Sequence, residues 1–165
     1  MEYLRDEIEQ IIGEQKIDRA RFFEASKRSY GQIIMCIENA FVDKSKRWDN
    51  DIHWANTGSY RPNLKCVNAE LKDWSSWMSN LPEIIPFPDD SVYLLLEDTK
   101  NYEPKYWLYE VFLSELVLVL GESELLDDFY IVSKKYDWLI SLNHHDIISY
   151  VGENLKTAGI ALDTI

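Results

Sequence analysis

Apolar residues recur at the spacing of amphipathic helices in the first part of the chain. They repeat every three or four positions over residues 4–12, and Gly13 lies where such a helix would end. A second apolar stripe runs over residues 33–41, and Ser29 before it is a residue type that caps helix amino termini. This pattern predicts two helices that each bury one face.

The next part of the chain is less regular. Asp18 could cap a short helical segment, and residues 43–70 are polar and rich in turn formers, which predicts irregular structure. Residues 71–81 place Leu, Trp and Met side chains on one side of a third helix, and Pro82 is expected to stop it. We therefore expect residues 1–82 to be mainly helical.

From residue 91 the pattern changes to short apolar runs separated by turns, which is typical of β-strands. Residues 113–120 suit a helix or a buried strand, and Gly121 favours the helix because glycine commonly follows a helix carboxyl terminus. The expected strands are residues 92–97, 106–111, 129–133, 138–142 and, as a strand or a turn of helix, 147–151.

These elements predict the α+β class, with N-terminal helices packed on a mostly antiparallel sheet formed by the C-terminal half, within residues 91–152. The chain has 165 residues, the usual size of one domain, so a single domain over residues 1–165 is expected. Its two cysteines, Cys36 and Cys66, are too few for a disulfide framework and are expected to be buried thiols.

Charge narrows the classes of partner. The formal net charge is −12, and residues 91–165 hold thirteen acids and five bases, which is −8 of that total. An acidic surface repels nucleic acids and membranes and attracts basic proteins. The longest apolar run is far too short to span a membrane, and the amino terminus has no secretory pattern, so a cytoplasmic protein is expected.

The run His144-His145-Asp146 is the first candidate for chemistry. Adjacent residues on a strand point to opposite faces, so both histidines could bind one metal ion only in a turn. The usual metal-ligand spacings are absent, and no glycine-rich phosphate loop occurs, so neither a metal nor another cofactor is expected. A turn supported by His144 and Asp146 is the main interpretation, and a metal site or a site of acid–base catalysis is the alternative.

A second candidate is a surface for protein recognition. Glu122, Glu124, Asp127 and Asp128 lie within seven residues without a base among them, and could attract a basic partner. Aromatic residues of the expected central hairpin could anchor the contact, because Tyr and Trp dominate many interfaces. Alternation along the strand sends Tyr106 with Leu108, and Trp107 with Tyr109, to opposite faces. The aromatic candidates are Tyr102, Trp107 and Tyr109.

Three segments resemble a pattern of uncharacterised small bacterial proteins: Lys-Tyr-Trp-Leu-Tyr-Glu at residues 105–110, Ser-Lys-Lys-Tyr-Asp-Trp-Leu at 133–139, and Asn-His-His-Asp at 143–146. In size, acidity and helix-plus-sheet plan the chain is also similar to bacterial immunity proteins, which neutralise toxins. That resemblance implies a protein that binds a cognate basic toxin domain and has no catalytic activity. A small enzyme with a site around His144, His145 and Asp146, and a general interaction module, are the alternatives.

Overall fold

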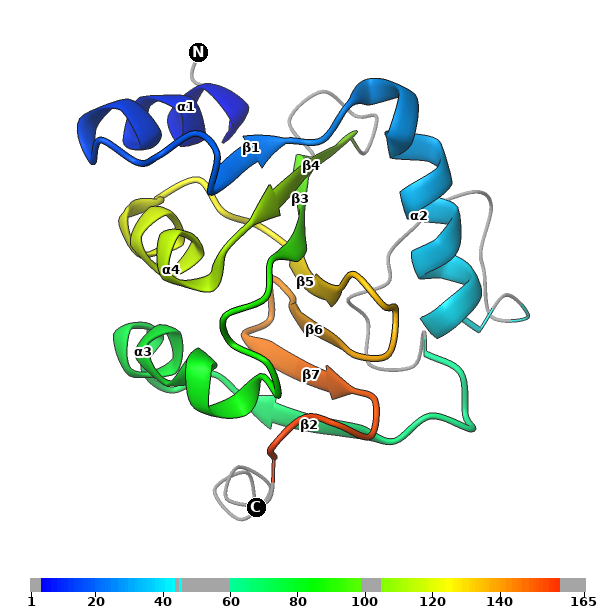
Figure 1. Ribbon diagram of the computed structural model, residues 1–165. Coiled ribbons are helices and arrows are strands. Elements are labelled where there is room, and N and C mark those ends of the chain that lie inside the picture. The colour runs from blue at the N-terminus through cyan, green and yellow to red at the C-terminus, as the bar shows by residue number, and fades with distance from the viewer. Residues whose placement is uncertain (1–3, 44, 46–59, 99–104, 158–165) are drawn as a thin grey trace.

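A computed structural model of the protein describes residues 4–43, 45, 60–98 and 105–157 (Figure 1). At its centre the described residues form one antiparallel sheet of seven strands, in the order β1-β4-β3-β5-β6-β7-β2. The strands are β1 (Phe22–Glu24), β2 (Cys66–Glu70), β3 (Val92–Asp98), β4 (Lys105–Val111), β5 (Phe129–Ser133), β6 (Leu139–Leu142) and β7 (Ile147–Val151). The helices are α1 (Leu4–Glu14), α2 (Lys27–Phe41), α3 (Trp74–Ile84) and α4 (Leu113–Glu122).

Helices cover both faces of the sheet. α1, α3 and α4 lie on one face and α2 on the other, as Figure 1 shows. Strand β4 supplies side chains to both cores: Trp107 and Tyr109 pack on the side of α1, α3 and α4, whereas Tyr106 and Leu108 pack on the side of α2. Each face of the sheet therefore carries its own apolar core, and the alternation predicted for β4 is confirmed.

The α+β class is confirmed, and so is the helix over residues 113–120. The sheet also recruits two strands from the first half of the chain, β1 and β2, which form its two edges. Residues 147–151 are a strand that pairs with both β6 and β2. The prediction that the C-terminal half alone forms the sheet therefore missed the two edge strands, β1 and β2.

Three local expectations are corrected by the structure. Asp18 organises a turn by accepting a hydrogen bond from the Ala20 amide at 2.9 Å, and strand β1 follows where a helix was expected. Helix α2 begins at Lys27 after Ser26, three residues before the start implied by a cap at Ser29. Helix α3 continues through Pro82 to Ile84, and its last turn is closed by the Ile85 amide, which donates to the Leu81 oxygen at 3.0 Å.

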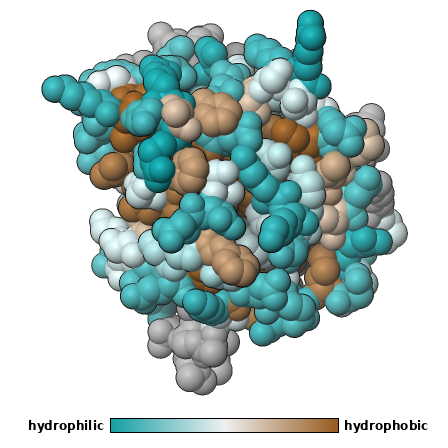
Figure 2. All heavy atoms as spheres, in the orientation of Figure 1, coloured by the Kyte–Doolittle hydropathy of each residue, from teal (hydrophilic) through white to brown (hydrophobic). Residues whose placement is uncertain are grey.

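The surface is mixed rather than broadly apolar. On the side seen in Figure 2, hydrophobic residues form small groups between hydrophilic ones. Among the described residues, no helix combines the length and the apolar character that crossing a membrane would need.

Gly152 closes β7 in a conformation that only glycine adopts readily, with φ of 114°. A Cβ atom there would lie 2.4 Å from the backbone oxygen of Asp137. We expect Gly152→Ala to lower the free energy of unfolding by roughly 2–4 kcal/mol, because backbone strain adds to this clash. Urea unfolding measures the change, with Gly13→Ala in α1 as the control, since a Cβ at Gly13 meets nothing within 4 Å. Equal stability of the two variants would contradict the prediction.

Candidate functional site: an acidic cleft at one end of the sheet

The two sequence candidates, the acidic segment and the histidine turn, meet at one cleft of about 430 Å³. It lies between the start of α3, the segment that links α4 to β5, and the turn between β6 and β7. We call it the acidic cleft. Its apolar residues are Leu71, Trp74, Leu126, Phe129 and Leu142. Its polar residues are Ser123, Glu124, Asp127, Asn143, His144 and Asp146.

Helix α1 holds the acidic segment in place. The carboxylate of Glu7 accepts hydrogen bonds from the Ser123 hydroxyl, from the Glu124 amide at 2.9 Å and from the Leu125 amide at 3.3 Å. These bonds pair three donors of the segment that follows α4 with one carboxylate of α1. The side chains of Glu122 and Glu124 are left exposed to solvent. Glu124 therefore lines the cleft on a fixed backbone, and Glu122 is exposed two residues before it, at the end of α4.

The turn between β6 and β7 is organised by Asn143. Its side-chain oxygen accepts hydrogen bonds from the amides of His145 at 2.9 Å and Ile147 at 3.0 Å. Asp146 adopts a left-handed backbone conformation with φ of 60°, which Asp tolerates better than most residues. The predicted turn is present, but the bonds expected from the side chain of Asp146 are made by Asn143 instead.

Asp128 joins the two parts of the cleft from beneath. Its Oδ1 atom accepts the His144 amide at 2.6 Å and lies 3.0 Å from His144 Nδ1. The Asp128 side chain is 7% exposed and that of His144 is 54% exposed. A proton on Nδ1 satisfies this contact and leaves Nε2 as an acceptor toward solvent. Asp128 is therefore a buried support for His144, and its predicted role as a surface charge is corrected.

The other predicted residues are dispersed. Tyr109 is fully buried beside Phe22, with ring centroids 5.2 Å apart, so its predicted direct contact with a partner is wrong. Burial raises the pKa of the Tyr109 hydroxyl. Trp107 is half-buried, donates to Asp98 Oδ2 at 3.1 Å, and has the Arg5 guanidinium 5.5 Å from its ring centre. Tyr102 lies outside the described residues.

Sequence reasoning did not assign the apolar floor of the cleft to a site. Trp74 makes an edge-to-face contact with Phe129, with centroids 6.1 Å apart and planes at 89°. The sequence placed Trp74 on the buried side of α3, which is correct, but gave no indication that its ring also borders a cleft. Only the packing of α3 beside β5 and the β6–β7 turn creates that surface.

The acidic cleft also brings together three groups of metal-ligand type. One ligand atom each from Asp127, Asp128 and His144 lies within 4.8 Å of the others. No sequence spacing predicts this cluster, because Asp128 and His144 are sixteen positions apart. Structural zinc sites use four protein ligands, and Asp128 Oδ1 already accepts from His144. The contact thus has a structural role that needs no ion.

We expect purified protein to contain no stoichiometric transition metal, because the Asp128–His144 contact is satisfied within the chain. Elemental analysis of protein purified without chelators measures this. One zinc ion per chain in the wild type, lost in His144→Ala, would contradict the expectation. His145→Ala is the control, because His145 is a neighbour that is not among the three clustered groups.

We expect Asn143→Ala to lower the free energy of unfolding by about 1–3 kcal/mol, because two backbone amides lose their acceptor. Asp146→Gly should leave stability unchanged or raise it slightly, since glycine adopts a positive φ without strain. Thermal and urea unfolding compare the two variants. A larger loss for Asp146→Gly than for Asn143→Ala would show that the Asp146 side chain organises the turn after all.

Comparisons with known proteins give a family without an assigned activity. No curated protein and no solved structure matches the chain. One protein family does match, over residues 1–160, and it is described as a family of unknown function, DUF6756. Because this match covers nearly the whole chain, the protein belongs to the DUF6756 family.

Proposed function

We propose that this protein is a bacterial immunity or inhibitor protein that binds and neutralises a basic toxin domain in the cytoplasm. The observation that carries the proposal is the acidic cleft, which combines an apolar floor with a carboxylate rim. Lys and Arg side chains need both kinds of surface, since their methylene groups pack on apolar residues while the charged end seeks a carboxylate. The cleft thus has the chemistry to receive a basic side chain from a partner.

Charge pairing elsewhere in the described residues supports this proposal. Several bases pair with acids away from the cleft, including Arg5 with Glu24, Arg21 with Glu115 and Lys134 with Glu110. The side chains of Glu122, Glu124 and Asp146 form no ion pair within the part of the chain that the structure describes. Within these described residues, the three carboxylates therefore contribute negative potential that no ion pair neutralises.

The aromatic wall of the cleft favours a cation over a neutral ligand. Trp74 packs against Phe129 on one side and Trp77 on another, with a Trp74–Trp77 centroid distance of 5.9 Å. These contacts hold the indole ring in one orientation at the edge of the cavity. A cation beside such a ring gains attraction from its π-electrons, and nearby carboxylates add to it. Nucleic-acid-cleaving toxins carry basic surfaces, which makes them suitable partners.

A second candidate function rests on His144 and Asp128. A buried carboxylate that orients a half-exposed histidine at a cavity is the arrangement used for general base catalysis. The sequence alternative of an enzyme at His144, His145 and Asp146 would then use His144 as the base, with Asp128 as its support. The two candidates separate experimentally, because binding depends on the carboxylates of the rim and general base catalysis on the imidazole of His144.

The proposal is tested by co-expression with a toxin domain encoded beside this gene, followed by binding kinetics. Glu122→Gln with Glu124→Gln should lower the association rate constant roughly three- to tenfold at low ionic strength and change dissociation much less. The control is Asp89→Asn with Asp90→Asn, an exposed pair at the opposite end of β3 and β5 that equally moves the net charge from −12 to −10. The control should keep most of the wild-type rate.

Salt and His144 complete the experiment. The wild-type association rate should fall as salt rises, because screening weakens attraction between exposed charges. His144→Gln should still bind and neutralise the toxin. No complex with the toxin, or equal rates in the two double variants at every salt concentration, would refute the proposal. Loss of toxin neutralisation in His144→Gln with unchanged binding would favour the enzyme instead.

A further inference from the structure

Among the residues that the structure describes, strand β2 forms an edge of the sheet and pairs with β7 on its inner side. The hydrogen bonds just beyond its two ends define its register. Leu71 N donates to Asp146 O at 2.7 Å, and Gly152 N donates to Lys65 O at 2.9 Å. In an antiparallel pair, residues alternate between those that bond to the neighbouring strand and those that face away. Residues 65, 67, 69 and 71 of this strand therefore bond inward to β7.

The backbone groups of Cys66, Asn68 and Glu70 consequently face outward, away from β7. Within the described part of the chain, no backbone hydrogen bond satisfies them. All three residues are exposed, which also corrects the expectation that Cys66 is buried. Such a row of outward N–H and C=O groups is able to pair with another strand. The opposite edge, β1, offers only three residues.

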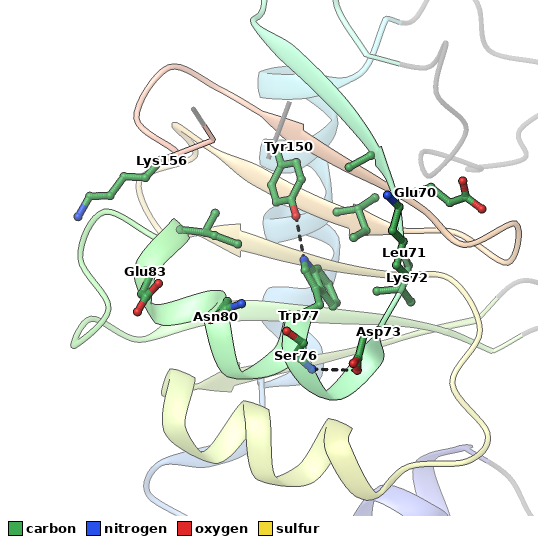
Figure 3. A pocket seen from close by; sticks show the side chains of 13 residues that line it. Glu70, Leu71, Lys72, Asp73, Ser76, Trp77, Asn80, Glu83, Tyr150 and Lys156 are labelled. Carbon is green, nitrogen blue, oxygen red and sulfur yellow. Dashed lines mark hydrogen bonds between the residues drawn. The ribbon is translucent and has the colours of Figure 1, made fainter. Parts of the chain in front are cut away.

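A cavity of about 390 Å³ lies beside this edge, between β2 and α3 (Figure 3). Ala69, Ile148 and Ile84 supply its apolar surface, together with the rings of Trp77 and Tyr150. The two rings are fixed to each other, since Trp77 Nε1 donates to the Tyr150 hydroxyl at 2.9 Å, as the dashed line shows. Burial raises the pKa of Tyr150 to about 12, although the bond from Trp77 lowers it, so the hydroxyl remains neutral.

We propose that β2 binds an extended segment of a partner protein as an additional strand, with apolar side chains of that segment in the cavity beside α3. The geometry follows from the pleat. Val67, Ala69 and Leu71 point to the α3 side. Partner residues opposite them point to the same side, because paired residues share a face. Alternate side chains of an added strand would therefore enter the cavity, while its backbone pairs with Cys66, Asn68 and Glu70.

The occupant that fits is a strand that alternates aliphatic residues with Lys or Arg. Aliphatic side chains suit the Ala69, Ile84 and Ile148 surface. The remaining side chains would point to the opposite face, beside Glu70, which is exposed there. A second copy of this chain is disfavoured as the occupant, because two molecules of net charge −12 repel each other. A basic segment gains from that same charge.

This inference goes beyond the proposed function, because it does not require the partner to be a toxin. The cavity beside α3 and the acidic cleft adjoin at Leu71, which lines both. A single partner could thus place a strand on β2 and a basic side chain in the cleft. The two sites can still be tested separately, since neither Glu124, which lines the acidic cleft, nor its neighbour Glu122 lines the cavity beside α3.

The probe is a displayed library of peptides in which Val, Ile or Leu alternates with randomised positions. Each peptide has about eight residues, which is long enough to pair along all of β2. Selection on the wild-type protein should enrich Lys and Arg at the randomised positions. One enriched peptide is then synthesised and measured against two variants, Asn68→Pro and Asn68→Ala. Both variants lose the Asn68 Oδ1 bond from the Ser149 hydroxyl, which makes them a matched pair.

Asn68→Pro removes an outward N–H and leaves the inner bonds to β7 intact, which an edge strand tolerates. It should weaken peptide binding by about tenfold or more, whereas Asn68→Ala should stay within about threefold of the wild type. Hydrogen exchange on the wild type provides a second measurement that needs no variant. The amides of Cys66, Asn68 and Glu70 should exchange more slowly when the peptide is bound.

Four results would overturn the proposal. They are a selection that enriches no peptide, equal binding to both variants, protection by the peptide at amides away from β2, and a dimer of the free protein that Asn68→Pro abolishes. The last result would identify a second copy as the occupant. Failure of this test with a preserved salt-dependent toxin complex would leave the acidic-cleft proposal standing.

Discussion

The burial of the central sheet on both faces is the constraint on which the rest of the structure depends. Strand β5 is buried at every residue, and Leu94, Leu95 and Leu96 of β3 are fully buried in succession. An antiparallel sheet with apolar residues on both faces needs helices on both sides, and the chain supplies α2 for one face and three helices for the other. Within the described residues helices therefore cover both faces, and the two proposed sites lie at an end and at an edge of the sheet.

Helix α3 contributes an aromatic residue to each of the two proposed sites. Trp74 lines the acidic cleft, and Trp77 lines the cavity beside β2. The side chain of Asp73 caps the helix by accepting the Ser76 amide at 3.2 Å, which fixes where the first turn begins. Both aromatic rings also pack against the core. The apolar part of each proposed site is therefore held by the same contacts that hold the sheet.

The central strands could be predicted because each one is a short apolar run between turns, whereas the edge strands could not. β1 has three residues, and β2 alternates exposed Cys66, Asn68 and Glu70 with less exposed neighbours in a polar region. The acidic cleft could be predicted only in part. Its exposed carboxylates are visible in the sequence, but the contact between Asp128 and His144 depends on two segments that only the fold brings together. Alternation placed Tyr109 on the same face of β4 as Trp107, which is correct, and gave no information on whether helices cover that face.

The acidity of the chain is consistent with its open edge. Exposed edge strands pair readily with one another, and proteins commonly prevent this with charged residues near the edge. Lys65 precedes β2 and Glu70 ends it, so two charged residues flank the edge and oppose its pairing with another copy. A net charge of −12 adds long-range repulsion between copies, which acts before the edges can meet. The same field would attract a basic chain, so the charge that opposes pairing between copies of this protein would favour the class of partner proposed for β2 and the acidic cleft.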